Sequence, residues 1–219
     1  HTVSGYDVTF SNALYTKDDF TISESAKTSL TKTNAGNYDM ELTADDFANK
    51  NNNFKNVTFK IVDGKLVIKP IEATVTITGH NNTATYDGEE HIVSGYDVTS
   101  ISNNLYKEAD FKLSGTAEAK RTEYGTTSMG LTADSFENTN TNFSNVTFNV
   151  TDGYQAITQL DKVVVTITGH NNTADYDGKE HTVTDYDVQI SNDLYKVTDI
   201  DFTGTSKEAK RTDAGTTNR

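Results

Sequence analysis

Apolar and polar residues alternate in several short stretches of the chain, which is the pattern of β-strands with one face buried. In residues 74–78, Val75 and Ile77 alternate with threonines, so we expect these two side chains to face the core. Residues 146–150 alternate in the same way, and residues 91–101 are predicted to form one longer strand. The pattern predicts six or seven short strands over residues 74–163.

Two Asp-Gly pairs separate the predicted strands, Asp87-Gly88 and Asp152-Gly153. Glycine adopts positive φ without steric cost, so Asp-Gly between extended stretches predicts a β-hairpin. We therefore expect each pair to connect two neighbouring antiparallel strands.

Helical signals are confined to short segments. Thr132 is a good N-cap and Asp134 would lie in the first turn, which predicts one short helical turn over residues 132–137. The fold class is therefore all-β, most simply a β-sandwich of the Ig-like type. A β-grasp-like module is the alternative. It needs a helix that crosses the sheet, and residues 106–111 and 132–137 are short for that purpose.

The same pattern returns every 90 residues. His1, His91 and His181 each begin a copy of one segment, and residues 76–83 are identical to residues 166–173. Between these anchors the register slips by one residue and later recovers, as insertions at turns and bulges do. The chain is thus a tandem array of one folded module.

One position carries glycine in two copies and aspartate in the third, which concerns the φ angle of the backbone there. Asp185 stands where the earlier copies have Gly5 and Gly95. We therefore expect that positive φ is not required at this position.

The period predicts three domains. Residues 1–73 (the first repeat) are a partial β repeat without its opening strand, residues 74–163 (the second repeat) are complete, and residues 164–219 (the third repeat) lack the C-terminal strands. We expect a longer protein to contain this chain, with signal and anchoring sequences outside it. Open sheet edges invite pairing, so self-association into oligomers or fibres is also expected.

The junctions between repeats are short. Residues 70–73 and 159–162 connect the copies, and neither stretch has the Gly/Ser composition of a flexible linker. Modules joined this closely predict an extended rod.

Composition limits the partners and the chemistry. Only 34% of the residues are hydrophobic, but 10 Phe and 11 Tyr supply compact cores and argue against disorder. A net charge of −13 without a Lys/Arg cluster argues against nucleic acid and anionic membranes as partners. The absence of cysteine excludes disulfides. No apolar stretch is long enough for membrane insertion.

The sequence favours no catalysis and no cofactor. It contains no Gly-x-Ser-x-Gly nucleophile motif, and a tandem sandwich rarely places two carboxylates across a cleft. We expect no enzyme activity and no catalytic residue. A structural calcium ion is the metal that the sequence favours, because Asp and Asn oxygens suit hard cations. Its candidate ligands are Asp45, Asp46, Asp199 and Asp201.

Three tyrosines at equivalent positions are the candidate ligand-binding residues, namely Tyr15, Tyr106 and Tyr195. As exposed rings they would form a weak glycan or protein site in each repeat, and linked sites would gain from avidity. Packing inside or between modules is the alternative.

Three motifs of the chain resemble those of MBG/YDG-type repeats. They are Tyr-Asp-Gly at Tyr86 and Tyr176, the following Gly95-Tyr96-Asp97-Val98, and the ending Asn-Phe-x-Asn-Val-Thr-Phe at Asn53 and Asn142. Such repeats occur in large cell-surface adhesins of bacteria, chiefly Gram-positive ones. The resemblance covers the whole chain. It implies an extracellular location at the cell surface or cell wall, with neighbouring repeats and a host glycan or protein as partners.

Three functions remain open. The first is a structural stalk that projects a functional tip from the cell. The second is a repeated weak adhesion module, and the third is a strand-exchanging module of a self-assembling extracellular fibre. A glycan array separates the first two, and a strictly monomeric state in light scattering would count against the third.

Overall fold

The computed structural model describes residues 1–218, and these form strands, loops and 3₁₀ turns without any α-helix. The strands form two- and three-stranded sheets, and none of the sheets closes into a barrel. The prediction of an all-β, sandwich-like fold is confirmed. The helix that the β-grasp alternative requires is absent from the described residues, and none of their helical turns is long and apolar enough to cross a membrane.

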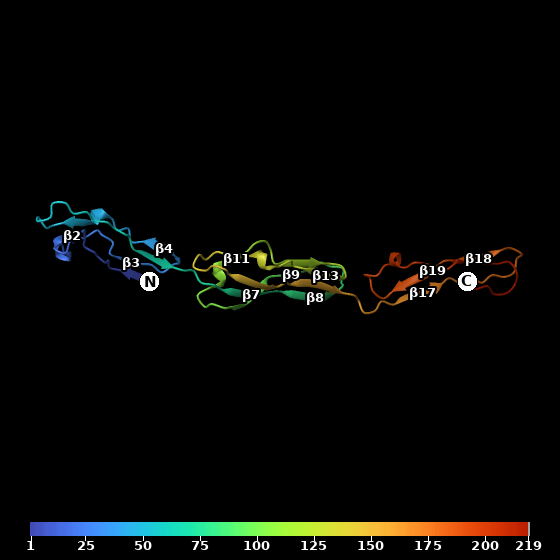
Figure 1. The fold of residues 1–219 in the computed structure, drawn as a ribbon. Coiled ribbons are helices and arrows are strands. Elements are labelled where there is room, and N and C mark those ends of the chain that lie inside the picture. The colour runs from blue at the N-terminus through green and yellow to red at the C-terminus, as the bar shows by residue number, and fades with distance from the viewer. Residues whose placement is uncertain (219) are drawn as a thin grey trace. The chain divides into compact units, whose positions relative to one another are not determined.

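The chain divides into two compact units (Figure 1). One unit comprises His1–Gly79, Tyr96–Ala117 and Gly130–Asp152, and the other comprises His80–Gly95, Glu118–Met129 and the chain from Gly153 onward. The second repeat therefore contributes strands to both units.

The second repeat contains more strands than the six or seven predicted. They are β7 (Thr74–Gly79), β8 (Asn81–Thr85), β9 (His91–Ser94), β10 (Tyr96–Ile101), β11 (Phe111–Leu113), β12 (Glu118–Arg121), β13 (Gly125–Ser128), β14 (Phe136–Asn138), β15 (Thr147–Thr151) and β16 (Tyr154–Thr158). The single strand predicted over residues 91–101 is wrong. Gly95 has a φ of 93°, which ends β9 and lets β10 join another sheet.

Each three-stranded sheet of the second repeat has one central strand. Strand β7 lies between β10 and β15, antiparallel to the first and parallel to the second. Strand β16 lies in the same way between β13 and β8. Val75 and Ile77 on β7 are 0% exposed, which confirms that they face the core.

Aromatic side chains form the core beside β7. Phe111 and Phe148 meet edge to face with ring centroids 5.3 Å apart, and Phe136 stacks on Phe148 at 5.7 Å. Tyr106 lies against Phe143 at 4.8 Å. Such pairs add about 0.5–1.5 kcal/mol each beyond the burial of apolar area, so a few aromatic residues stabilise a module with little other apolar content.

The first and third repeats have fewer strands. The first repeat contains β1 (Thr2–Ser4), β2 (Phe20–Ile22), β3 (Ser29–Thr31), β4 (Gly36–Asp39), β5 (Phe47–Asn49) and β6 (Lys65–Ile68). The described part of the third contains β17 (Val165–Gly169), β18 (His181–Thr184), β19 (Tyr186–Ile190) and β20 (Glu208–Arg211).

Short 3₁₀ turns lie at equivalent places in the repeats. They are η1 (Lys17–Asp19), η2 (Ala44–Asp46), η3 (Glu108–Asp110), η4 (Ala133–Ser135) and η5 (Val197–Asp199). Thr132 is the N-cap of η4, and its backbone N–H donates to Ser135 Oγ at 3.1 Å. The helical turn predicted there is confirmed.

The two Asp-Gly pairs do not form the predicted hairpins. Asp87-Gly88 connects β8 to β9, Asp152-Gly153 connects β15 to β16, and in both cases the two strands belong to different sheets. The side chains of Asp87 and Asp152 accept hydrogen bonds from backbone N–H groups. Asp87 Oδ1 accepts a hydrogen bond from the N–H of Glu89 at 2.9 Å, which is the Asx-turn geometry. The chain thus arches from one sheet to another.

The Asp152 carboxylate holds the turn after β15 to the segment before η4. Its oxygens accept hydrogen bonds from the N–H groups of Gly130 and Leu131 at 3.0 and 2.9 Å. We expect Asp152→Ala to lower the free energy of unfolding by about 1–3 kcal/mol, because both donors lose their acceptor. Urea denaturation measures this. Asp152→Asn keeps one oxygen acceptor and should lose less, so equal losses for the two variants would contradict the assignment.

Positive φ is present at the position where Asp replaces glycine. Gly5, Gly95 and Asp185 have φ values of 86°, 93° and 65°. The expectation that this position does not require positive φ is therefore wrong. Asp is among the few non-glycine residues that adopt the left-handed region readily, so the third repeat keeps the backbone conformation with another residue.

The junction between the first and second repeats is held by hydrogen bonds on both sides. The N–H of Ile71 donates to the carbonyl of Asn142 at 3.0 Å, and the N–H of Ser144 donates to the carbonyl of Ile71 at 2.9 Å. Asn142 Oδ1 accepts from the N–H of Ala35 in the first repeat at 2.7 Å. Asn142 therefore contacts both the junction and the first repeat.

Candidate functional site

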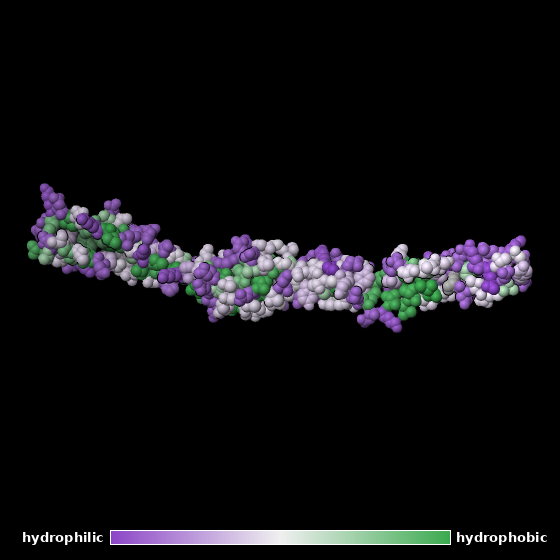
Figure 2. Space-filling view, turned by 45° about the vertical axis from the view of Figure 1, so that its right-hand side comes forward, coloured by the Kyte–Doolittle hydropathy of each residue, from purple (hydrophilic) through white to green (hydrophobic). Residues whose placement is uncertain are grey.

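The first repeat contains a groove between two extended segments, and aromatic side chains form part of its lining. Residues 6–12 form one wall and residues 56–62 form the other, and the groove encloses about 530 Å³. The remaining lining side chains are Tyr15, Phe20, Leu42, Phe47 and Phe54. We call this space the first-repeat groove. Figure 2 shows apolar surface in this repeat, at the left of the view.

In the second repeat the corresponding space is filled by β7. The walls correspond to β10 and to residues 145–151, which include β15, and β7 pairs with both strands. In the first repeat neither wall is assigned as a strand. The two walls of the first-repeat groove are thus equivalent to the two segments that flank β7 in the second repeat.

Burial differs between the two repeats in the way that this comparison predicts. Phe136 and Phe143 of the second repeat are each 5% exposed, while the equivalent Phe47 and Phe54 are only half-buried. On the walls, Phe10 is 36% exposed and Val62 is 96% exposed. The first repeat therefore has the same aromatic core with one side uncovered.

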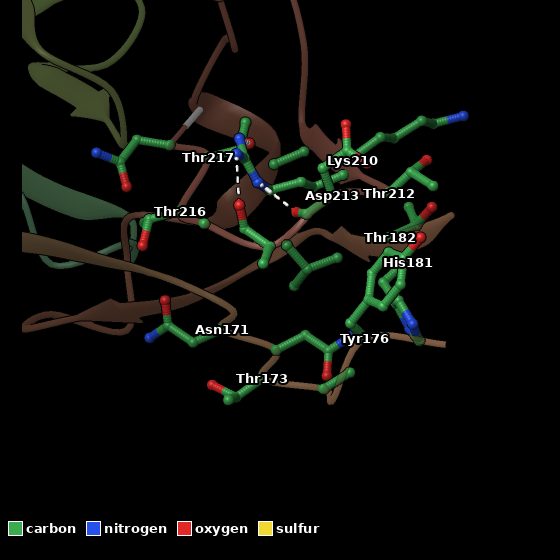
Figure 3. A pocket seen from close by; sticks show the side chains of 18 of the residues that line it. Asn171, Thr173, Tyr176, His181, Thr182, Lys210, Thr212, Asp213, Thr216 and Thr217 are labelled. Carbon is green, nitrogen blue, oxygen red and sulfur yellow. Dashed lines mark hydrogen bonds between the residues drawn. The ribbon is translucent and has the colours of Figure 1, made fainter. Parts of the chain in front are cut away.

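The third repeat contains a second groove, shown in Figure 3, which encloses about 880 Å³. It is lined by residues 169–176, 181–183 and 209–218. Residues 171–175 correspond to β8 and residues 215–218 to β13, the two neighbours of β16. This third-repeat groove is thus the place of a β16-type strand.

Polar side chains dominate the third-repeat groove. In Figure 3, Asn171 and Thr173 lie across the cavity from Thr216 and Thr217. Arg211 donates to Thr217 Oγ1 at 3.1 Å and to the carbonyl of Asp213 at 2.7 Å, so it fixes the loop at one end of the cavity. The cavity offers backbone edges and hydroxyls.

The three candidate ligand-binding tyrosines lie in equivalent folded positions. Tyr15 and Tyr106 are 8% and 1% exposed, and Tyr195 is half-buried. The Tyr106 hydroxyl lies 3.1 Å from the Asp110 carbonyl oxygen and 2.9 Å from Asn138 Oδ1. Burial leaves no open ring face for a sugar at Tyr15 and Tyr106. The structure therefore gives these two residues a packing role and does not support the platform expectation.

Burial raises the pKa of Tyr106 to about 12, and the nearby Asp110 carboxylate adds to the shift. The folded state therefore holds the phenol proton more tightly than the unfolded state, whose tyrosines have a pKa of about 10. We expect the stabilisation to be complete below pH 10 and to be lost as the pH rises through about 12. Absorbance at 295 nm should show a late-titrating tyrosine that Tyr106→Phe removes. An unchanged titration curve in that variant would contradict the assignment.

The candidate calcium ligands do not come together. Asp46 Oδ2 accepts hydrogen bonds from the N–H and hydroxyl of Thr43 at 2.8 and 3.0 Å, and Asp199 Oδ2 accepts from the N–H of Lys196 at 2.8 Å. Asp45 and Asp201 are exposed. Within residues 1–218 no group of three or more His, Cys, Asp or Glu side chains could hold a metal ion. Asp46 and Asp199 therefore cap 3₁₀ turns.

A recurrent Asp–His contact stabilises the arch after the Tyr-Asp-Gly motif. His91 Nε2 lies 3.1 Å from Asp87 Oδ1, and His181 Nε2 lies 3.0 Å from Asp177 Oδ1. The pKa of Asp87 lies below its usual range because the carboxylate accepts the backbone hydrogen bond of Glu89 and contacts His91. The pKa of Asp177 is lowered in the same way, by the backbone hydrogen bond of Lys179 and the contact with His181. These pairs are exposed and belong to the turn itself.

These features define a class of small all-β modules that repeat in tandem, and the three-stranded sheets of the second repeat are each built around a central strand. The MBG domain family matches residues 1–79. This match is consistent with the MBG-type repeat that the motifs predicted, and residues 91–169 repeat the matched stretch at the 90-residue period. Comparisons with curated proteins and with solved structures give no match.

Proposed function

We propose that this chain is a set of spacer repeats in an extracellular bacterial surface adhesin, which hold a functional tip away from the cell. The observation that carries the proposal is the junction at residues 70–73, where Asn142 bonds both to Ile71 and to Ala35 of the first repeat. A junction with bonds on both sides resists bending. This is the property that a spacer needs and that a flexible linker lacks.

Two further observations support a structural role. Tyr106 and Asp152 of the second repeat stabilise the fold of that repeat. Tyr106 packs in the core, and the Asp152 carboxylate accepts hydrogen bonds from the backbone. The MBG domain match over residues 1–79 supports a repeat module of a surface protein. The proposal includes no enzymatic activity and no cofactor, so turnover of a glycan substrate would contradict it.

The experiment measures the distance between spin labels placed in the first and second repeats. We expect a narrow distance distribution in the native chain and a broader one in Asn142→Ala, which removes the side-chain bond to Ala35. Asn53→Ala changes the equivalent residue of the first repeat and serves as the matched control. A broad distribution in the native chain would contradict a spacer role.

A glycan array with the same protein tests the competing adhesion function. The spacer proposal expects no specific binding. Reproducible binding that is lost when one exposed aromatic residue is replaced would favour an adhesion module instead.

A further inference from the structure

Residues 86–89 of the second repeat, which we call the Tyr-Asp-Gly arch, lie against a leucine of the third repeat. A Cβ atom placed on Gly88 would lie 3.0 Å from Leu194 Cδ2. Both residues belong to the same compact unit. We propose that the arch is a docking site for the leucine of the following repeat, and that its glycine leaves the space which the leucine occupies. The proposal goes beyond the spacer role, because it assigns a recognition site to the arch.

The leucine is presented by the same turn in every repeat. We call this Asn-x-Leu-Tyr segment the leucine turn. In each copy the N–H of the leucine donates to Oδ1 of the asparagine two residues earlier, at distances between 2.9 and 3.0 Å. The N–H of the following tyrosine donates to the carbonyl of the same asparagine. The turns contain Leu14, Leu105 and Leu194.

The fold of a repeat does not bury this leucine by itself. Leu14 and Leu105 are 79% and 68% exposed, whereas Leu194 is half-buried. The tyrosines that follow show the opposite order, because Tyr106 is 1% exposed and Tyr195 is half-buried. Tighter packing inside the third repeat therefore does not explain the covering of Leu194. The contact with the preceding repeat covers it.

The arch is held in shape by its own repeat. Asp87 Oδ1 accepts a hydrogen bond from the N–H of Glu89 at 2.9 Å and lies 3.1 Å from His91 Nε2. The N–H of Tyr86 donates to the carbonyl of Thr158 at 2.9 Å, which ties the arch to the end of β16. A site that is already ordered loses less conformational entropy when it binds than a mobile loop does.

The leucine turn is tied in the same way to the start of the third repeat. The N–H of Val164 donates to Ser191 Oγ at 2.8 Å, and the N–H of Ser191 donates to the carbonyl of Val164 at 2.9 Å. Residues 159–163 therefore run between two fixed points, Thr158 beside the arch and Val164 beside the leucine turn. Docking of Leu194 on the arch adds a second connection across this junction.

Glycine is needed in the arch for two separate reasons. The φ of Gly88 is 84°, in the left-handed region that disfavours residues with a Cβ atom. A Cβ atom would also come closer to Leu194 Cδ2 than the ordinary carbon–carbon contact of about 3.5–4.0 Å. The equivalent Gly178 of the third repeat has a φ of 75°, and no atom of the described residues lies within 4 Å of a Cβ atom placed there. This pair separates the backbone requirement from the docking requirement.

The direct test is nuclear Overhauser spectroscopy of the full chain with labelled leucine methyl groups. We expect a cross-peak between the methyl protons of Leu194 and the Hα protons of Gly88. The methyl protons of Leu105 serve as the control in the same spectrum, because that side chain is 68% exposed. A spectrum without the cross-peak between Leu194 and Gly88 would overturn the proposal.

Distances between spin labels test the consequence for the junction. The chain has no cysteine, so labels can be attached through Thr126→Cys and Gln189→Cys, at exposed positions on β13 and β19. We expect Leu194→Ala to widen the distance distribution roughly twofold, because residues 159–163 are then the remaining connection. Leu105→Ala makes the same change in the leucine turn of the second repeat and should leave the distribution as it is in the native chain.

A second pair of variants keeps the test independent of the leucine. Gly88→Ala should widen the same distribution, while Gly178→Ala imposes a similar backbone cost and should not widen it. Equal effects of the two glycine variants, or a distribution that Leu194→Ala leaves unchanged, would overturn the proposal. Neither result would contradict the spacer role, which is tested separately at the junction of the first and second repeats through Asn142.

Discussion

Replacing Tyr106 with alanine should lower the free energy of unfolding of the second repeat by about 3–5 kcal/mol, the cost of removing a large buried aromatic side chain. Tyr106 is 1% exposed, its ring lies against Phe143 and Phe111, and its hydroxyl is within hydrogen-bond distance of Asp110 and Asn138. The substitution removes the packing and the hydroxyl contacts together. Hydrogen exchange followed by mass spectrometry measures the loss for this repeat separately from the others.

Two variants separate the contributions at this position. Tyr106→Phe removes only the hydroxyl and should cost about 1 kcal/mol. Tyr195→Ala changes the equivalent residue of the third repeat, which is half-buried and whose hydroxyl donates to the Asp199 carbonyl at 3.0 Å. It should cost clearly less than Tyr106→Ala. Equal losses at the two positions would show that the core of the second repeat does not depend on Tyr106.

The second large effect is expected at Ile77, and the chain contains its own control. Ile77→Ala should cost about 2–5 kcal/mol, because the side chain is fully buried on the central strand of a sheet. Ile167→Ala makes the same change in identical local sequence, but this side chain is 55% exposed. At concentrations low enough for the chain to be monomeric, it should cost less than about 0.5 kcal/mol.

This pair tests whether burial or local sequence controls stability, because residues 76–83 and 166–173 are identical. Hydrogen exchange resolved by repeat gives both values from one protocol. Similar losses for the two variants would mean that Ile167 is covered in solution.

Local patterns predicted the features that depend on neighbouring residues. Alternation placed Val75 and Ile77 in the core, and the Thr132 cap placed a helical turn. The prediction of two hairpins was wrong because an Asp-Gly pair specifies a tight turn but does not specify which strands pair. The carboxylates of Asp87 and Asp152 bind backbone, and the chain passes to another sheet. Strand pairing depends on contacts distant in sequence, which periodicity does not encode.

The candidate site was only partly predictable. The repeat aligned residues 6–12 with residues 96–102 and residues 56–62 with residues 145–151, but it did not show that these two segments flank one groove. That required the pairing of β7 with both β10 and β15, which are separated by more than 40 residues of sequence. The burial of Tyr106 shows a related limit of the sequence. Composition shows that Tyr106 is aromatic and polar, and only the fold shows that its ring is covered.

The parallel pairing inside each three-stranded sheet has a mechanical consequence. The chain enters one sheet at the start of β7 and leaves it at the end of β15, with five residue pairs in register from Thr74 opposite Thr147 to Thr78 opposite Thr151. It enters the other sheet at β8 and leaves at β16 with five pairs again. A pull on the two ends of the repeat would therefore act along the strands in opposite directions. It would load the hydrogen bonds of each pair in shear, so that they break together and not one after another.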